Sequence, residues 1–144
     1  AVNYYVQKGR QIDAVVLLQP TSPLRTKTNI TDALALYHDD IDAVVSVKKT
    51  YSNPYFSLYE EEENGFLKKS KELNISRRQD APDVYELNGA IYILNVSSIN
   101  KYSSISEFPR AIKYVMAKEN SVDIDDLMDF NYCEFLLNQG IASL

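Results

Sequence analysis

The hydrophobic residues of this chain fall into short runs separated by polar segments, a pattern typical of a layered α/β domain. Residues 30–39 carry apolar side chains at helical spacing, and Thr28 or Asn29 can cap that helix. A strand, a helix and a strand joined by short connections predict a βαβ unit, and therefore a parallel sheet with helices on its faces. Three apolar runs have the length and continuity of buried strands: 13–19, 43–47 and 90–94.

Both ends of the chain have helical patterns. Residues 1–9 predict the tail of a helix that stops at Gly9, which suggests a chain that begins within a fold. Residues 123–137 begin with aspartates and continue with apolar residues at helical spacing, which predicts a closing helix. Before it we expect a short helix capped by Ser97 and a last strand over 111–118.

The middle of the chain departs from this pattern. Asn53-Pro54 breaks the chain, and residues 55–59 alternate between polar and apolar side chains as a strand does. Asn64-Gly65, after a run of glutamates, predicts the tip of a hairpin. Residues 68–83 are polar and basic with few core candidates, so this segment is either a surface excursion or an arm that packs on a partner.

Composition and charge mainly exclude certain classes of protein. A chain of 144 residues, 45% of them hydrophobic, is long enough for one domain with a buried core. A net charge of -5 argues against a general nucleic-acid binder, and no apolar run is long enough to span a membrane. The lone Cys133 leaves no disulfide framework and no cysteine-based zinc site.

The four glycines are far apart, so the chain has no glycine-rich loop that could cradle a phosphate. If the protein handles a nucleotide, we expect the phosphate-binding segment on another chain or ahead of Ala1.

The segment Leu17–Arg25 follows a predicted strand, at the place where α/β sheets bind ligands. The amide of Gln19 and the hydroxyls of Thr21 and Ser22 provide hydrogen-bond donors and acceptors. A proline-braced loop that leads into a helix explains the same residues equally well.

Two further segments have a binding and a structural interpretation. The adjacent guanidinium groups of Arg77 and Arg78 suit a carboxylate or a phosphate, or they form a solvated basic turn. Asn88-Gly89 brings an amide and a close backbone approach to a ligand, or forms a bulge before a core strand.

Asp123 and Asp125 form the sharpest candidate site. Carboxylates two residues apart in an extended loop point the same way and suit a hard cation such as Mg²⁺. Acidic residues at a helix N-terminus also complement the helix dipole, and this explains part of the same cluster.

Four segments in this order, LLQPTSPLR, RRQDAP, NGAIYI and SVDID, resemble the cytidylyltransferases that activate nonulosonic acids, namely the CMP-sialic acid synthetases and their legionaminic-acid relatives. The resemblance runs from about Ile12 to Leu137. It implies a single domain over 1–144, folded as a partial Rossmann-like nucleotidyltransferase three-layer sandwich. It also implies a protruding arm over 50–87 through which the protein forms a homodimer.

The same resemblance implies a reaction. The family transfers CMP from CTP to a sialic-type acid and releases pyrophosphate with Mg²⁺, and its bacterial products enter lipopolysaccharide or capsule biosynthesis. The lone cysteine, the absence of a signal sequence and the need for CTP favour a cytoplasmic protein. Because the CTP loop of the family has no counterpart here, we expect the isolated chain to turn over poorly or not at all.

Roles for individual residues follow from the resemblance. The substrate-binding candidates are Gln19, Thr21, Ser22, Asn88 and Tyr92, with Arg78 as the arginine that meets the acidic sugar, and Asp123 and Asp125 match the two metal aspartates. Arg78, Asp123 and Asp125 are therefore the expected catalytic residues. Glu86 stands where some members have an arginine, which leaves the identity of the sugar open.

Two alternative functions remain. One is a complete, non-catalytic module that dimerises or associates with a full-length paralogue. The other is a cytidylyltransferase for the related sugar acid Kdo, although NGAIYI and R-Q-x-x-P fit the sialic-acid branch better.

Overall fold

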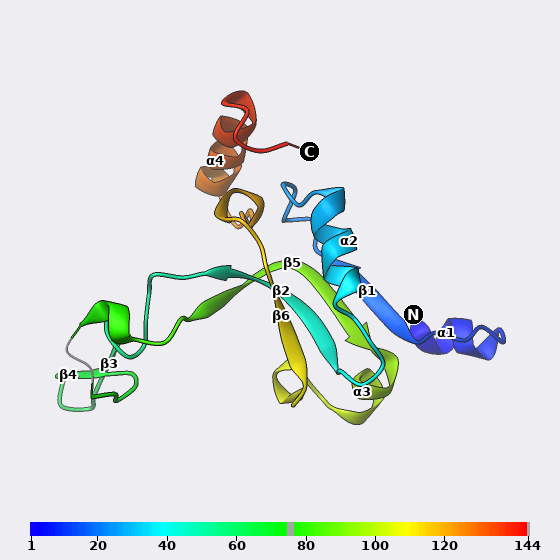
Figure 1. The fold of residues 1–144 in the computed structure, drawn as a ribbon, viewed down its shortest axis with the longest axis horizontal. Helices are drawn as coiled ribbons and strands as arrows, with labels where there is room; N and C mark the ends of the chain where they lie inside the picture. The colour runs from blue at the N-terminus through cyan, green and yellow to red at the C-terminus, as the bar shows by residue number, and fades with distance from the viewer. Residues whose placement is uncertain (75–76, 144) are drawn as a thin grey trace. The chain divides into compact units, whose positions relative to one another are not determined.

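The computed structural model describes residues 1–74 and 77–143, which fold into two compact units (Figure 1). The first unit is formed by residues 1–48 and by the chain from residue 87 onward. The second unit consists of residues 49–86.

The first unit is built on a mixed four-stranded sheet with the strand order β1-β5-β2-β6. β1 pairs with β5 in the antiparallel sense, and β2 pairs with β6 in the parallel sense. The Asn95 amide donates to the Asp42 carbonyl and the Ile91 amide to Ser46 Oγ, so residue numbers fall along β5 as they rise along β2. The strands are β1 Ala14–Leu18, β2 Ala43–Lys49, β5 Tyr85–Asn95 and β6 Ala111–Val115.

This topology corrects the expected parallel sheet. β1 and β2 run in the same direction but are not neighbours, because the antiparallel β5 lies between them. β1 was expected to be buried, and instead it is an edge strand on which Val16 is 42% and Leu17 45% exposed. A continuous apolar run indicates that a strand can be buried, but it does not determine which strands pair with it. Those pairings depend on residues far along the chain.

The helices lie close to their predicted places, but their first residues differ. Thr26 caps α2 in a capping box with Asn29, Asn95 caps α3, and Asp126 caps α4. The expected caps Thr28 or Asn29 and Ser97 were therefore wrong, because several hydroxyl and amide side chains compete near each start. The helices are α1 Val2–Gln7, α2 Lys27–Ala35, α3 Val96–Lys101 and α4 Leu127–Asn138, with three 3-10 turns, η1 Arg78–Asp80, η2 Ile105–Glu107 and η3 Lys118–Asn120.

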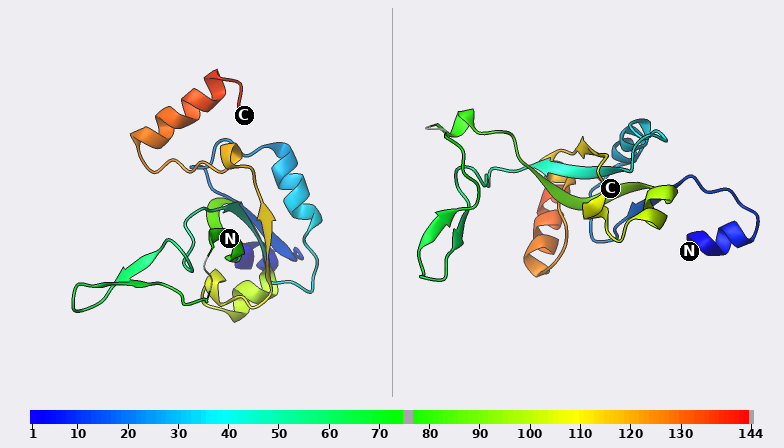
Figure 2. Two further views of the ribbon diagram at one scale, coloured as in Figure 1. Left: turned by 60° about the vertical axis from the view of Figure 1, so that its left-hand side comes forward. Right: turned by 90° about the horizontal axis from the view of Figure 1, so that it is seen from below.

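Apolar clusters hold the first unit together. The larger cluster joins Ala33 of α2 to Val44, Ile91 and Ile93 of the sheet. α2 lies beside the sheet (Figures 1 and 2). The smaller cluster joins Leu24 to Cys133 and Leu136 of α4. Cys133 and Leu136 are the buried side chains of α4, whereas Leu127 and Phe130, which are also apolar, are exposed.

The second unit contains a hairpin of β3 Tyr59–Glu61 and β4 Leu67–Lys69. Its predicted tip is confirmed, since the Glu62 amide donates to the Phe66 carbonyl and Gly65 has a φ of +81°. The expected strand over 55–59 was wrong for its first residues, which form a turn closed on the Asn53 carbonyl. At the base of the unit, Lys49 Nζ lies 2.8 Å from Asp83 Oδ1.

None of the described helices has the length and apolar character needed to cross a membrane.

Candidate active site

Gln19 and Asp123 meet at Gly89 near the carboxyl end of β1, and Ser22 is bonded to Asp123. Ser22 Oγ donates to Asp123 Oδ1 at 3.3 Å. A β-carbon built on Gly89 would lie 3.3 Å from both Asp123 Oδ2 and Gln19 Oε1. Segments that are 70 and 34 residues apart along the chain, at Gln19, Gly89 and Asp123, therefore meet at one point. Gly89 itself has a φ of +73°, a conformation that suits glycine.

The loop that carries Gln19 is held from within. Arg25 Nη1 donates to the carbonyls of Gln19, Ser22 and Ala90, and the Ile124 amide donates to the Thr21 carbonyl at 2.8 Å. Burial lowers the pKa of the Arg25 guanidinium. Arg25 thus positions the loop.

Ser22 and Thr21 have different environments. Ser22 is fully buried and its hydroxyl is bonded to Asp123, so it orients the carboxylate. The Thr21 side chain is exposed beside it.

Asn88 is only 4% exposed and is bonded within the chain. Its Oδ1 accepts from Ser46 Oγ at 2.6 Å and from the Ala90 amide at 3.2 Å. Its Nδ2 donates to Ser121 Oγ at 2.9 Å and to Met116 Sδ at 3.4 Å. An amide donates two hydrogen bonds and its oxygen accepts two, so these four contacts use the full capacity of the Asn88 side chain. A contact with the sugar would therefore replace one of them.

Tyr92 does not join the cluster around Gly89. It pairs with Leu17 in the β1–β5 ladder. It lies three residues further along β5 than Gly89, a separation of roughly 10 Å in a strand.

The four aspartates between residues 123 and 129 have different surroundings. Asp126 Oδ1 accepts from the amides of Met128 and Asp129, and Asp129 Oδ2 accepts from the amides of Asp125 and Asp126. This pair serves the N-terminus of α4, as the dipole argument anticipated. Asp123 lies instead in the cluster around Gly89, and Asp125 has an exposed side chain between the two groups.

Across residues 1–74 and 77–143, no three or more His, Cys, Asp or Glu side chains gather as the ligands of a metal ion. Carboxylates do suit Mg²⁺, which commonly uses one or two of them together with phosphate oxygens and water. The donor chemistry of Asp123 and Asp125 therefore fits a magnesium ion that takes its remaining ligands from substrate and solvent.

Arg78 belongs to the second unit and opens the turn η1. Its Nη2 donates to the Tyr51 carbonyl at 2.9 Å, and its guanidinium lies 5.8 Å from the centre of the Tyr51 ring. The side chain is exposed, as is that of Arg77. Tyr51 thus holds one edge of the Arg78 fork.

Comparison with known proteins gives matches along most of the chain, although no family model matches it. The chain is 28% identical over 130 residues to the post-translational flagellin modification protein B of Campylobacter coli, which covers 90% of this chain. It is 36% identical over 116 residues, 80% of the chain, to the N-acylneuraminate cytidylyltransferase of Streptococcus agalactiae. It is 28% identical over 132 residues, 92% of the chain, to the CMP-N,N'-diacetyllegionaminic acid synthase of Legionella pneumophila.

The matched part of the chain belongs to the CMP-sialic acid synthetase family. This confirms the resemblance carried by the four motifs. The chain spans about half the length of two of these relatives, 54% of the Campylobacter protein and 57% of the Legionella protein, and 28% of the Streptococcus protein.

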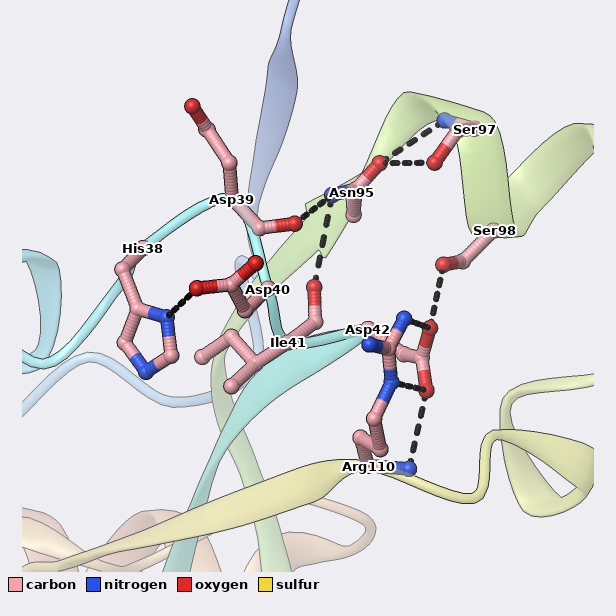
Figure 3. Close-up of polar contacts among 9 residues, drawn as sticks. All are labelled: His38, Asp39, Asp40, Ile41, Asp42, Asn95, Ser97, Ser98 and Arg110. Atoms are coloured by element: carbon pink, nitrogen blue, oxygen red, sulfur yellow. Dashed lines mark hydrogen bonds and ion pairs between the residues drawn. The ribbon is translucent and has the colours of Figure 1, made fainter.

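This CMP-sialic acid synthetase-like chain has a second polar cluster that was not predicted from the sequence (Figure 3). Asp42 is 2% exposed, and its carboxylate accepts from Ser98 Oγ at 2.6 Å and from the backbone and guanidinium of Arg110. Nearby, Asn95 Nδ2 donates to the carbonyls of Asp39 and Ile41. An aspartate at the start of an apolar strand was the available signal, since such a group needs a partner when buried.

An open hollow of about 440 Å³ lies beside this cluster, at the end of β1 opposite Gln19. The side chains of Asn95 and Ser97 that line it are bonded to one another and to the backbone. The side chains of Asn95 and Ser97 are therefore already satisfied within the chain.

Proposed function

We propose that this chain provides the sugar-binding and metal-binding part of a CMP-nonulosonate synthetase. Such an enzyme transfers CMP from CTP to a sialic-type acid and releases pyrophosphate. The observation that carries the proposal is that Gln19 and Asp123 meet at Gly89 near the carboxyl end of β1, with Ser22 bonded to Asp123. The names of the Streptococcus and Legionella relatives, which describe a cytidylyltransferase and a CMP-sugar synthase, support the reaction class.

The reaction needs the sugar hydroxyl in line with the α-phosphate and the phosphate charge compensated. Gln19 offers an amide that both donates to and accepts from sugar hydroxyls. Ser22 orients Asp123 through its hydroxyl, and Arg25 holds the Gln19 loop. These residues therefore form a preorganised wall on which the sugar is positioned.

Asp123 and Asp125 are the proposed ligands of Mg²⁺. When bound, the ion supplies Lewis-acid compensation of the charge that develops on the phosphate oxygens. The hydrogen bond from Ser22 fixes the position of one oxygen of Asp123 for this role.

Arg78 is proposed to bind the carboxylate of the sugar acid. A guanidinium is a fork that pairs with a carboxylate through two parallel hydrogen bonds. The bond from Nη2 to the Tyr51 carbonyl restrains the side chain before substrate arrives.

We propose that the homodimer forms through residues 50–87 and that the α/β unit is part of a Rossmann-like nucleotidyltransferase sandwich. The exposed Phe66 and Leu67, adjacent on the hairpin, support the first statement. The mixed sheet with α2 packed on it supports the second. A cytoplasmic location and a role in lipopolysaccharide or capsule biosynthesis follow from the same proposal.

The function is tested by a chimera in which this chain replaces the matched residues of the Legionella synthase. The chimera is given CTP, Mg²⁺ and either N,N'-diacetyllegionaminic acid or N-acetylneuraminic acid, and both pyrophosphate and the CMP-sugar are measured. We expect turnover with at least one acid, and loss of turnover in the same chimera carrying Asp123→Asn.

A folded chimera that is inactive with both acids contradicts the proposal. If it instead uses Kdo, the alternative sugar class is correct. If it binds the acids without turnover, the non-catalytic module is the better description.

A further inference from the structure

The dipeptide Asn-Gly occurs twice in the sequence, at Asn64-Gly65 and at Asn88-Gly89. An asparagine side chain is chemically least stable before glycine, because glycine has no side chain to keep its backbone nitrogen away from the preceding amide group. The structure places these two identical dipeptides in opposite environments. One lies at the exposed tip of the β3–β4 hairpin, and the other lies where β5 becomes buried.

The side chain of Asn88 is held at both of its polar atoms. It is 4% exposed, and its Nδ2 donates to Ser121 Oγ and Met116 Sδ. Its Oδ1 accepts from Ser46 Oγ and from the Ala90 amide. To react, this amide group has to leave four hydrogen bonds and meet water, which requires the first unit to unfold. The fold therefore protects Asn88.

Asn64 is far less restrained. Asn64 and Gly65 are both exposed, and a β-carbon built on Gly65 would meet only Glu61 Oε1, at 4.0 Å. The Gly65 amide donates to the Glu62 carbonyl at 2.8 Å, so its nitrogen becomes available when the tip of the hairpin opens. Because each strand pairs over only three residues, this opening is local and requires little free energy.

From this contrast we propose that Asn64 is a site of spontaneous deamidation, whereas the fold protects Asn88. The Gly65 nitrogen attacks Cγ of Asn64, and the new C–N bond closes a five-membered succinimide ring. The bond from Cγ to Nδ2 breaks, and ammonia leaves with the proton from the Gly65 nitrogen. One water molecule then opens the ring at either carbonyl, which gives aspartate or isoaspartate. Water is the only co-reactant, and nothing is oxidised or reduced.

The product fits the hairpin less well than asparagine does. Asn64 Nδ2 donates to Glu62 Oε2 at 3.5 Å. An aspartate oxygen in this place has no hydrogen to donate, and its charge repels that of Glu62. Isoaspartate also lengthens the backbone between residues 64 and 65 and displaces Oδ1, which accepts from the Phe66 amide. Deamidation should therefore loosen the tip of the hairpin.

A loosened tip affects the exposed Phe66 and Leu67, which support the proposed homodimer. We expect the deamidated chain to dimerise more weakly than the fresh chain in sedimentation equilibrium. This consequence rests on the proposed function, because it needs an interface through residues 50–87. A chain that is monomeric both before and after conversion would refute that interface and would leave the deamidation site unaffected.

Peptide mapping by mass spectrometry tests the modification itself. The chain and the Legionella chimera are incubated at mildly alkaline pH, with and without enough urea to unfold them, and loss of the amide is followed separately at Asn64 and Asn88. In the folded proteins we expect Asn64 to convert more than about 100-fold faster than Asn88. In urea the two rates should become similar, because the dipeptides are identical.

A substitution tests the route of the reaction. Gly65→Ala should slow the conversion of Asn64, because the added methyl group shields the attacking nitrogen, and Gly140→Ala is the matched control at another glycine of positive φ. The proposal is overturned if Asn64 and Asn88 convert at equal rates in the folded proteins, or if Gly65→Ala converts as fast as Gly140→Ala. It is also overturned if the product is aspartate alone, because opening of a succinimide yields isoaspartate as well.

Discussion

Asp42 and Arg110 form a bidentate pair across the starts of β2 and β6. Arg110 Nη2 lies 3.2 Å from Asp42 Oδ1, and Arg110 Nε lies 3.4 Å from Asp42 Oδ2 (Figure 3). The backbone amide of Arg110 donates to the same Oδ2 at 2.8 Å, and Ser98 Oγ donates to Oδ1. One buried carboxylate thus ties together the two parallel strands and α3.

This pair predicts a specific acid sensitivity. Hydrogen bonds from Ser98 and Arg110 hold the pKa of the Asp42 carboxyl below its usual value. Its contribution to stability is therefore complete above the unfolded-state pKa, about 3.9, and is lost as the pH falls through the lower folded pKa. Asp42→Asn should lower the Tm at pH 7, and the difference from the parent should shrink at acidic pH.

Thermal unfolding from pH 7 to pH 2 checks this expectation. The matched control is Asp40→Asn, because the Asp40 side chain is exposed and lies 3.9 Å from an exposed His38. Equal Tm values for the parent and Asp42→Asn at pH 7 would contradict the stabilising role.

Gly89→Ala should harm the site more than the fold. Its φ of +73° strains any other residue by roughly 1–2 kcal/mol, and the new methyl would press on Gln19 and Asp123. Gly140→Ala is the control, since Gly140 has a φ of +65° and open space around it. We expect similar losses of unfolding free energy but loss of turnover only for Gly89→Ala in the chimera. Equal turnover by the Gly89→Ala and Gly140→Ala chimeras would contradict the proposed crowding of Gln19 and Asp123.

Asn88→Ala should destabilise the first unit by about 1–3 kcal/mol, because it leaves buried partners such as Ser46 and Ser121 without their hydrogen bonds. Denaturant unfolding measures the change. Asn131→Ala, on the exposed side of α4, should stay within about 0.5 kcal/mol of the parent. A small effect for Asn88→Ala, together with a raised KM for the sugar, would favour the ligand contact instead.

Asp125→Ala and Asp126→Ala separate the metal role from the capping role. Asp126 caps α4, so its removal should cost about 1 kcal/mol of unfolding free energy. Asp125→Ala should leave the free energy of unfolding unchanged. It should raise the Mg²⁺ concentration that gives half-maximal turnover of the chimera by more than roughly tenfold. Initial rates measured over a range of Mg²⁺ concentrations check both variants. An unchanged Mg²⁺ midpoint for Asp125→Ala would contradict the assignment of Asp125 as a metal ligand.

Arg78→Ala should raise the KM for the sugar acid roughly 10-fold to 100-fold with little change in the KM for CTP, since a charge-assisted pair contributes about 1.5–3 kcal/mol. Arg78→Lys should not restore binding, because lysine lacks the fork. Arg77→Ala is the neighbouring control. Equal effects on both substrates would contradict the carboxylate role.

The strand positions and the hairpin tip could be predicted because they depend on local patterns. The run 43–47 became the fully buried start of β2, and Asn64-Gly65 formed the tip of β3–β4. The caps of α2 and α3 were less predictable, because several capping side chains lie within three residues of one another and only the backbone path selects among them.

The candidate site was predictable in composition but not in geometry. Gln19, Ser22 and Asp123 were all candidates from their motifs; Gln19 and Asp123 meet at Gly89, and Ser22 is bonded to Asp123. Asn88 and Tyr92 were candidates from the same NGAIYI segment. Asn88 is hydrogen-bonded within the buried core, and Tyr92 lies further along β5.

The sequence by itself determined which segments become strands and helices, and which family the chain belongs to, because periodicity and motifs depend on residues that are close together in the sequence. Tertiary structure alone decided that β5 runs antiparallel between β1 and β2, and that Asp42 meets Arg110. It also decided that β1 stands at an edge. These are contacts between distant residues, and their choice depends on packing and hydrogen bonding across the whole sheet.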